Sequence, residues 1–562
     1  MPTPFHALAE LGEKLESTTK RKDMIAWAAS FILELETQEI EPAISMLMGR
    51  SFPKGDQRVL EVSWTTLNTS IRKITKTDSG GFSGAFGRTG DVGDATRIVF
   101  EESKVGRQAT LLKKPLTILE VRRAFETIAD AKGTGSREKK QRLLETLLGS
   151  ATPTEAKYLV KVLIGEMRTG FHEGLMELAI AKAFKVPAEL VQTASMLTGD
   201  IGEVATLAKT TGREGLLKVG FTIFRPVKPM LAQMAGTIDD ALAEHGGRTA
   251  FEYKMDGARV QIHKAGDTVK IFSRRLTDVT ESLPEIIDVV RDEVKADEAI
   301  LEGEAIAVGK DGKPMLFQHL MRRFRRIRKI ERAAEEIPVQ LYLFDALYVN
   351  NENLIKGPYT KRRERLAQVT DSIPLTPQIV AEDGRTAEEF MEKAIQAGHE
   401  GLMAKKLASP YTPGIRGKRW LKIKRILEPL DLVIVAAEYG YGRRHGWLSD
   451  YYLAARDSQT GDLMPVGKTF KGLTDSEIIK MTKRLKELAT KKEGHKIIVT
   501  PKIVVEVAYN EIQKSPKYNC GMALRFARIT RVRDDKYPEE ADTIQKVKQV
   551  YEQQFRKKAR YP

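Results

Sequence analysis

The chain has 562 residues, of which 41% are hydrophobic and 30% charged, and its formal net charge is +16. This composition excludes a disordered or fibrous protein and predicts a folded chain of three or four domains, because one core cannot grow to this size. The surplus of positive charge favours a polyanionic partner, most simply nucleic acid.

Cysteine content and the apolar runs indicate where the protein works. The single cysteine, Cys520, excludes disulfide bonds within the chain and cysteine-rich zinc modules. Residues 1–14 contain no apolar stretch typical of a signal peptide, and no uncharged run approaches the roughly 18 residues of a membrane span. We therefore expect a soluble, intracellular, cytoplasmic protein, associated with the nucleoid if its source is prokaryotic.

Residues 1–218 are predicted to form an all-α domain. Apolar residues recur at helical spacing from Met24 to Met48 and again from Ala156 to Met167. Between these helices, residues 79–90 are so rich in glycine that we expect no regular element there.

Two segments of this domain resemble each other, residues 89–96 and residues 198–206. They predict an internal repeat and a pseudo-twofold helical domain. Each copy places Gly and Asp before a helix, where free N–H groups can either cap the helix or bind a phosphate. The second interpretation predicts sequence-independent contact with a duplex backbone. The candidate DNA-binding residues are Arg168, Thr169, Gly170 and Gly199.

Residues 108–112 form a glutamine followed by paired apolar residues in a basic segment. Such a segment can dock in the pocket of a partner, for instance a sliding clamp. The alternative is an amphipathic turn with no partner.

From Pro226 and Pro229, which fit an interdomain linker, the pattern changes to β. Residues 260–263 and 269–272 alternate around a Gly-Asp turn and predict a hairpin. Just before them, Lys254 lies between two acids in the stretch 252–259. A lysine amine is ordinarily protonated, but nearby cations or burial lower its pKa and make it a nucleophile. We interpret Lys254 as a residue that takes a nucleotide covalently; the alternative is a charged hairpin edge.

Further motifs follow, each beside a predicted strand. Cationic side chains can bind ribose or phosphate, carboxylates can bind a ribose hydroxyl or Mg²⁺, and an aromatic ring can stack on a base. Each has a plainer alternative: a solvated strand face, a core ring, or an exposed edge protected against pairing. Together, in this order, they are typical of a nucleotide-transfer site. The residues are Arg274, Glu302, Glu304, Phe344, Glu400 at the start of the segment 400–405, Arg416, Lys422 and Lys424.

Residues 321–329 form the densest basic run, which we place on a helix that either touches DNA or is a solvated face. From about Asp431 short strands and basic, turn-rich loops predict a small barrel, in this context an OB-fold. The tail, residues 543–560, is predicted to be a basic helix without a readable role.

The motif set resembles the covalent nucleotidyltransferase superfamily and, over essentially the whole chain, the ATP-dependent DNA ligases of the archaeal/eukaryotic type. Residues 254–259 match the signature Lys-x-Asp-Gly-x-Arg, and residues 165–170 are the best match in the helical third. Residues 301–304, 342–345, 400–403 and 420–424 match the later motifs in sequence and order. Residues 524–536 resemble the family's final motif, although Ala527 stands where the family usually has proline.

The resemblance implies a multidomain fold: an all-α DNA-binding domain (1–218), an α+β nucleotidyltransferase domain with antiparallel sheets (219–428), and a β-barrel OB-fold domain with the C-terminal basic helix (429–562). It implies that Lys254 attacks the α-phosphorus of ATP. The expected ATP and AMP ligands are Glu252, Arg259, Arg274, Glu304, Phe344, Arg416, Lys422 and Lys424. Glu304 and Glu400 are expected to position Mg²⁺ or Mn²⁺, and the final motif contributes Arg525, Arg528, Arg533, Asp535 and Lys536 to the first step.

The implied function is ATP-dependent sealing of nicks in duplex DNA through a lysyl-AMP intermediate and a DNA-adenylate, in replication, repair and recombination. The expected partner is nicked double-stranded DNA, and the expected state is a monomer. An RNA ligase or a capping-type nucleotidyltransferase with the same lysyl-nucleotide chemistry is the alternative. A non-catalytic nucleic-acid-binding scaffold is the rival from another class.

Overall fold

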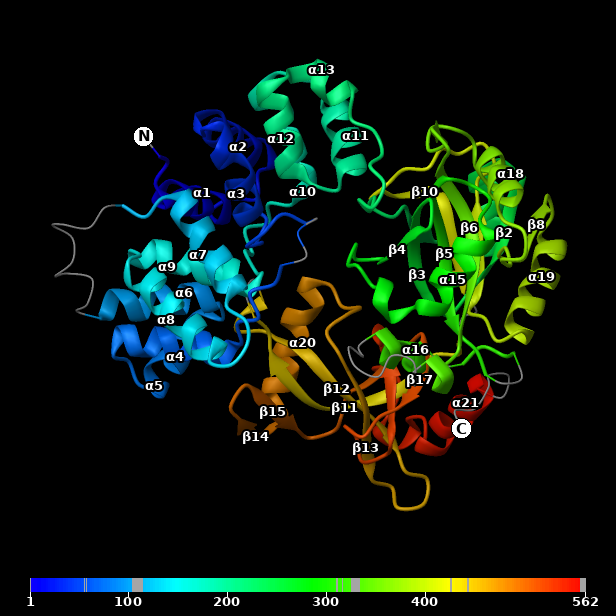
Figure 1. Cartoon of the computed structure of the whole chain (residues 1–562). Coiled ribbons are helices and arrows are strands. Elements are labelled where there is room, and N and C mark those ends of the chain that lie inside the picture. The colour runs from blue at the N-terminus through cyan, green and yellow to red at the C-terminus, as the bar shows by residue number, and fades with distance from the viewer. Residues whose placement is uncertain are drawn as a thin grey trace. The chain divides into compact units, whose positions relative to one another are not determined.

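The computed structural model describes residues 2–54, 56, 58–103, 115–309, 312–315, 317–324, 334–424, 427–441 and 444–555. The chain divides into two compact units, traced in Figure 1. The first contains Met1–Glu392 and Leu402–Ile423, and the second contains Lys393–Gly401 and Lys424–Arg560. Within the described ranges, no helix has both the length and the apolar composition to cross a membrane.

The first third of the described chain is helical, as predicted. Its helices are α1 Phe5–Glu16, α2 Arg21–Glu34, α3 Thr37–Leu47, α4 Trp64–Thr75, α5 Ser79–Thr89, α6 Val92–Glu102, α7 Ile118–Asp130, α8 Ser136–Gly149, α9 Pro153–Ile164, α10 Glu173–Phe184, α11 Ala188–Thr198, α12 Ile201–Thr210 and α13 Gly212–Leu217. The predicted segment 24–48 is interrupted after α2, and α3 begins with a capping box in which Glu36 and Glu39 each bind the other's backbone N–H.

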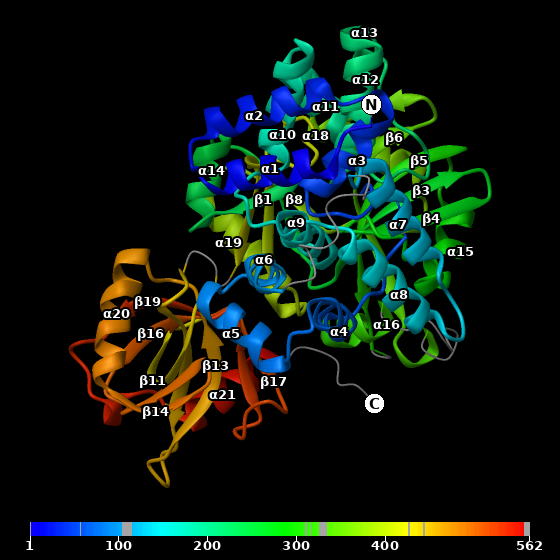
Figure 2. The same cartoon turned by 90° about the vertical axis from the view of Figure 1, so that its left-hand side faces the viewer.

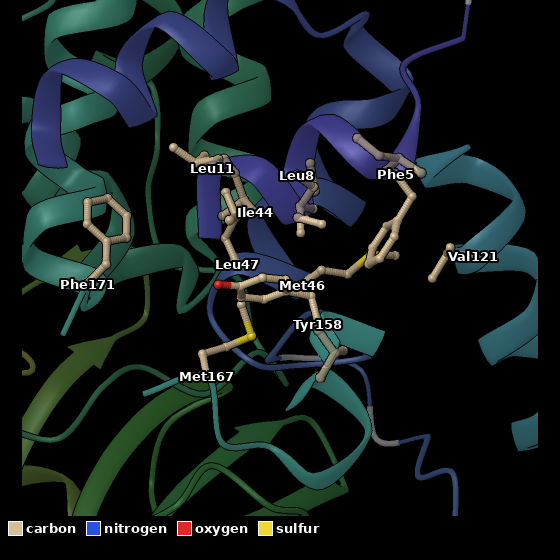
Figure 3. Close-up of a cluster of buried hydrophobic side chains, with 14 of the residues drawn as sticks. Phe5, Leu8, Leu11, Ile44, Met46, Leu47, Val121, Tyr158, Met167 and Phe171 are labelled. Carbon is tan, nitrogen blue, oxygen red and sulfur yellow. The ribbon is translucent and has the colours of Figure 1, made fainter. Parts of the chain in front are cut away.

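One apolar core holds these helices together. Phe5 and Leu8 of α1 point toward Met46 of α3 and Tyr158 of α9, and all four are fully buried (Figure 3). Gly12 lets α1 approach α9, because a Cβ at this position would lie 2.3 Å from a ring carbon of Tyr158. The apolar spacing that predicted helices therefore also marks the residues that pack.

The prediction for residues 79–90 is wrong: they form α5. Each helical glycine costs about 1 kcal/mol relative to alanine, but two features outweigh that cost. Asp78 caps the helix by accepting the Gly81 N–H at 2.7 Å. Phe82 and Ala85, three residues apart, are buried in the core of the domain. Gly90, with φ of +65°, then ends the helix in the left-handed conformation.

Residues 231–424 form two five-stranded sheets, coloured green to yellow in Figure 1. The first has the order β1-β10-β9-β2-β8 and the second the order β4-β3-β5-β6-β7. The strands are β1 Leu231–Met234, β2 Thr249–Lys254, β3 Ala258–Ala265, β4 Thr268–Ser273, β5 Glu298–Ala307, β6 Val339–Val349, β7 Glu352–Asn353, β8 Gln378–Ala381, β9 Gly401–Lys405 and β10 Arg416–Lys424. The predicted hairpin is confirmed as the antiparallel pair β3–β4.

One feature of these sheets differs from the prediction, and another excludes the alternative considered for Lys254. β1 pairs with β10 in parallel, not antiparallel, which the long crossover between them permits. β2 and β3 belong to different sheets, so the turn after Lys254 carries the chain from one sheet to the other and is not a hairpin edge.

Strand β6 carries two bulges against β5. The pairing runs from Ile300–Tyr348 to Leu301–Ala346, and from Glu302–Asp345 to Gly303–Leu343. Leu347 and Phe344 are therefore the unpaired extra residues. Bulges commonly re-aim side chains beside functional sites, and Phe344 is a predicted site residue.

Helices accompany these sheets: α14 Ile238–His245, α15 Pro284–Glu293, α16 Phe317–Phe324, α18 Tyr359–Val369 and α19 Gly384–Gln396, with the 3₁₀ turn η2 Thr280–Ser282. The start of the basic run lies on α16, as predicted, and residues 325–329 lie outside the described ranges. Arg323 in this run is buried, pairs with Glu285 at 2.5 Å and donates to Ile337 O at 2.9 Å. It is part of the core and not of a solvated face.

The second unit is rich in strands, as predicted, and Figure 2 shows α20 beside them. It contains β11 Leu430–Tyr439, β12 Leu448–Arg456, β13 Leu463–Thr469, α20 Asp475–Glu487, β14 Ala489–Glu493, β15 Lys496–Val499, β16 Val504–Ala508, β17 Glu511–Lys514, β18 Met522–Arg525, β19 Arg528–Val532, the 3₁₀ turn η4 Pro538–Glu540 and α21 Ile544–Phe555. The main sheet follows the order β13-β12-β11-β15-β14, with β16 between β11 and β19. Among the described strands no pairing closes it into a barrel. α21 accounts for the described part of the predicted tail helix.

Candidate functional site

The turn after Lys254 depends on a glycine. A Cβ on Gly257 would lie 2.5 Å from the carbonyl oxygen of Ala305 and 2.6 Å from a side-chain carbon of Ile306. The turn therefore packs directly onto β5, and Lys254 is held half-buried where the two sheets meet.

Arg259, the last residue of the signature 254–259, makes several polar contacts at the start of β3. Its guanidinium pairs with the buried carboxylate of Glu302, and donates to Met230 O at 2.6 Å and to the Tyr411 hydroxyl at 3.0 Å. Burial disfavours the charged form, but Glu302 and its neighbours outweigh burial and raise the pKa of Arg259. Glu302 is therefore the buried partner of Arg259, and its alternative as a solvated strand face is excluded.

Three predicted phosphate ligands lie in one electrostatic cluster. Burial, followed by the charges of Arg259 and Arg416, lowers the pKa of Arg274, and Glu304 opposes that shift. In the sheet register, Arg259 lies directly opposite Glu304. The fold thus brings the cations Arg259 from β3 and Arg416 from β10, together with the Glu304 carboxylate, near Arg274 in the turn after β4, and such a group of cations suits a polyphosphate.

Phe344 lies in a cluster of aromatic rings. Its ring contacts Trp420 edge to face, with centroids 6.2 Å apart, and it is 9% exposed. The alternative of a core ring is correct in that Phe344 packs in an apolar cluster with Trp420 and Tyr411. Trp420 shares its face of β10 with Lys422 and Lys424, because alternate residues of a strand point to the same side.

Glu252 and Lys405 form a buried ion pair beside this cluster. The Lys405 ammonium lies 2.5 Å from Glu252 Oε2 and donates to Phe344 O at 3.4 Å. Glu252 Oε1 accepts from the Tyr359 hydroxyl and from Gln378 Nε2. Lys405 lies outside the predicted site residues; its only sequence signal is a charge that ends an apolar strand.

The two predicted metal ligands, Glu304 and Glu400, have different neighbours. Glu400 forms an ion pair with Lys424 at 2.5 Å, so a predicted metal ligand and a predicted phosphate ligand contact each other. Within the described ranges, no three His, Cys, Asp or Glu side chains converge on a point where they could hold a metal. Mg²⁺ commonly takes one or two carboxylates and completes its shell with substrate phosphates and water, and Glu304 beside the arginine cluster fits that donor set.

The linker before β1 is bound to the same strand. The amide of Gln261 accepts the Val227 N–H at 2.7 Å and donates to Val227 O at 3.2 Å, and His263 Nδ1 accepts the Phe224 N–H at 3.1 Å. Arg259, Gln261 and His263 are alternate residues of one face of β3. This face fixes the linker from residue 224 to residue 230.

The repeat segments share one local structure, as predicted. Gly90 and Gly199 end their helices with φ of +65° and +67°, and the following residues, Asp91 and Asp200, cap the next helix. The capping interpretation is therefore correct at both junctions.

The remaining DNA-binding candidates follow α9. Arg168, with φ of +53°, donates to Gly90 O at 3.2 Å and pairs with Glu166 at 2.6 Å. Thr169 is buried, and its hydroxyl accepts the Phe171 N–H. Arg168 thus ties the loop after α9 to the first repeat junction. The predicted clamp segment, residues 108–112, lies outside the described ranges.

The final motif is held together by ion pairs in the second unit. Arg533 and Lys536 both contact Asp431, at 3.0 and 2.7 Å, and Arg533 pairs with Asp535 at 2.7 Å. This pairing raises the pKa of Arg533 and lowers that of Asp535. Arg525 pairs with Glu511 at 3.3 Å, and Arg528 is exposed.

Comparison with known proteins assigns the class. A model described as "ATP dependent DNA ligase domain" matches residues 229–424, "DNA ligase N terminus" matches residues 4–181, and "ATP dependent DNA ligase C terminal region" matches residues 444–536. The solved structure named "Pmar-Lig_PreS3" shares the fold, with a TM-score of 0.58 and 19% identity over 94% of this chain and 99% of that chain.

The chain also aligns end to end with curated relatives. It is 47% identical to "DNA ligase 1" of Korarchaeum cryptofilum over 98% of both chains, and 45% identical to "DNA ligase" of Thermococcus fumicolans over 99% of this chain and 100% of that one. The chain therefore belongs to the ATP-dependent DNA ligases.

Proposed function

We propose that this ligase seals nicks in duplex DNA through AMP carried on Lys254. The amine of Lys254 attacks the α-phosphorus of ATP, an N–P bond forms, the bond to the β-phosphate oxygen breaks, and pyrophosphate and a proton leave. AMP then passes to the 5′-phosphate at the nick. Finally the 3′-hydroxyl attacks that phosphate, and AMP is released.

The observation that carries the proposal is the cluster of Arg259, Arg274 and Arg416 with Glu304, next to the turn that bears Lys254. Arg259, Arg274 and Arg416 interact through their charges, and preplaced cations stabilise the charge that develops on a phosphorus under attack. Lys422 and Lys424 extend the same cationic set on β10. Those charges also favour the neutral, nucleophilic form of a nearby lysine.

We assign the residues that bind the base and the metal ion among the side chains of the two five-stranded sheets and the segments next to them. Glu252 is proposed on the amino side of adenine, and Phe344 against its ring. Glu304 and Glu400 would hold Mg²⁺ or Mn²⁺, which supplies charge neutralisation at the phosphates when bound. The Glu400–Lys424 ion pair would then open as carboxylate and ammonium turn to metal and phosphate.

We also propose a division of the chain into three domains. Its domains are a helical DNA-binding domain (1–218), a nucleotidyltransferase domain (219–428) and an OB-fold domain (429–562). Arg168, Thr169, Gly170 and Gly199 would contact the DNA backbone, because they lie in loops at helix ends, where Arg168 and Gly170 are exposed. In the third domain Arg525, Arg528, Arg533, Asp535 and Lys536 would orient the leaving pyrophosphate. We further propose a monomer that docks on a sliding clamp through residues 108–112.

The test begins with α-labelled ATP and Mg²⁺. The wild type should acquire a label that survives denaturation but not mild acid, and Lys254→Ala should acquire none. Equal labelling of the two would contradict the role of Lys254. Sealing of nicked DNA against nicked RNA duplexes then separates a DNA ligase from an RNA ligase, which is the alternative with the same lysyl chemistry.

A further inference from the structure

The buried ammonium of Lys405 is enclosed by three aromatic rings. Its Nζ lies 4.5 Å from the ring centre of Phe344, 4.6 Å from that of Trp420 and 4.8 Å from that of Tyr359. Lys405 is 1% exposed. A lysine rarely lies in such a place unless its charge is paired, and here the partner is Glu252 at 2.5 Å.

The two oxygens of Glu252 are held from opposite sides. On the α18 and β8 side, Oε1 accepts from Tyr359 and Gln378, and Arg363 lies 3.5 Å away. On the β9 side, Oε2 pairs with the Lys405 ammonium. Oε2 has a second lone pair, which can accept a further hydrogen bond. Its position therefore depends on Lys405.

Lys405 also fixes the neighbouring ring. It donates to the backbone oxygen of Phe344 at 3.4 Å, and Phe344 is the extra residue of a bulge and lacks a partner in the β5–β6 register. A cation over an aromatic face contributes about 0.5–2 kcal/mol. One side chain thus contacts both groups that are proposed to bind the base.

We infer that Lys405 is a positioning residue for nucleotide selection: it holds Glu252 Oε2 where that oxygen accepts the 6-amino group of adenine, and it holds Phe344 against the ring. This inference rests on the proposed function. A carboxylate oxygen accepts hydrogen bonds and repels another acceptor, so a base with a carbonyl oxygen at position 6 is rejected. Lys405 itself touches neither the base nor the reacting phosphorus.

The test compares ATP with inosine triphosphate, whose base carries an oxygen at position 6. Lysyl-nucleotide formation is measured for the full chain as KM and kcat with each nucleotide. For Lys405→Met we expect KM for ATP to rise about tenfold or more, with a smaller change in kcat. The preference for ATP over the inosine nucleotide should fall by about tenfold or more, since one lost charge-assisted hydrogen bond is worth at least that factor.

Three further variants separate selection from folding. Lys264→Met removes another buried ammonium, one that donates to the backbone oxygens of Arg291 and Val294, and should leave the ATP preference unchanged. Lys405→Arg, which keeps the charge, should retain part of the preference. If Lys405→Met does not fold, the double variant Glu252→Gln/Lys405→Met removes both buried charges and is expected to fold; it should also lose the preference.

An unchanged ATP preference in Lys405→Met, or in the double variant if the single one does not fold, would overturn the inference. Failure of the proposed function has a different signature in the same assay, because the wild type would then form no lysyl-nucleotide with ATP. A loss of thermal stability in Lys405→Met without any change in preference would assign Lys405 a purely structural role.

Discussion

Gln261 binds both polar groups of the Val227 backbone, and nothing in its side-chain amide is left unused. The amide oxygen accepts from Val227 N at 2.7 Å and from His263 Nε2 at 3.0 Å, and the amide nitrogen donates to Val227 O and to Glu302 Oε1. One residue of β3 thus joins the linker to the buried carboxylate that holds Arg259.

Replacing Gln261 with Leu should destabilise the first unit. The buried N–H and C=O of Val227 would lose their partners, and an unsatisfied buried polar group costs about 1–3 kcal/mol. We expect the free energy of unfolding, measured by urea titration of the full chain, to fall by about 2–6 kcal/mol for the two groups together. Gln233→Leu is the control, because that amide is exposed and donates one long bond. Equal stability of Gln261→Leu and the wild type would exclude this role of the amide.

His263 should make stability sensitive to acid. Burial lowers the pKa of His263 to about 3, and its Nδ1 accepts the Phe224 N–H, so the folded state holds the neutral ring. A histidine pKa that is depressed on folding contributes stability in full above the unfolded value near ~6.5, and that contribution is lost as the pH falls toward 3.

The measurement is urea unfolding at pH 7 and pH 5. The wild type should lose about 2 kcal/mol more than His263→Gln over this interval. His6→Gln, on α1 with a side chain 50% exposed, should follow the wild type. Parallel pH dependences of His263→Gln and the wild type would show that His263 is protonated in the folded chain.

The buried pair of Asp345 and Arg362 should be far more sensitive to substitution than an exposed pair. Arg362 binds both oxygens of Asp345, at 2.7 and 3.0 Å, and both side chains are fully buried. Removing one partner leaves the other charge buried without a partner, which costs about 3–5 kcal/mol. Arg362→Met should lower the thermal midpoint accordingly, whereas Lys295→Met, which removes the solvent-exposed pair with Asp371, should leave it unchanged. Similar midpoints for the two variants would contradict this account.

Gly257→Ala should disable nucleotide transfer. The added methyl group would lie 2.5 Å from Ala305 O, so the turn that carries Lys254 must move. A displacement of about 1 Å at a reacting group costs about 100-fold in rate, and we expect a loss of that order in the rate of lysyl-AMP formation. Gly220→Ala is the matched control, because its Cβ would meet no atom within 4 Å. Normal labelling of Gly257→Ala would show that the turn can adapt.

The order of motifs around Lys254 could be predicted from the sequence because each motif is local. A strand that ends in a charged residue, such as β2 at Lys254 or β10 at Lys424, is visible in alternating residue types. Their convergence is a tertiary property: Lys405 meets Glu252 and Phe344 only because β9 lies beside β2 and near β6. No local pattern in the sequence predicts that these aromatic rings and the Glu252 carboxylate surround the Lys405 ammonium.

The prediction for residues 79–90 is wrong because it relied on the local sequence alone. Glycine lowers the local preference for helix, but Phe82 and Ala85 gain burial that the local sequence does not reveal. Likewise, the strands of the second unit could be predicted from alternation, but the closure of a sheet depends on which distant edges pair.

The two bulges of β6 limit the insertions and deletions that this strand can accept. Each adds one residue opposite β5, and together they restore the alternation of faces, so Leu343 and Tyr348 follow the same in-and-out pattern as an unbulged strand. Losing one residue between them would turn every side chain on one side of the deletion to the opposite face of the sheet. Insertions and deletions here should therefore survive only in pairs, which would make the length of this strand more constant among relatives than its residues.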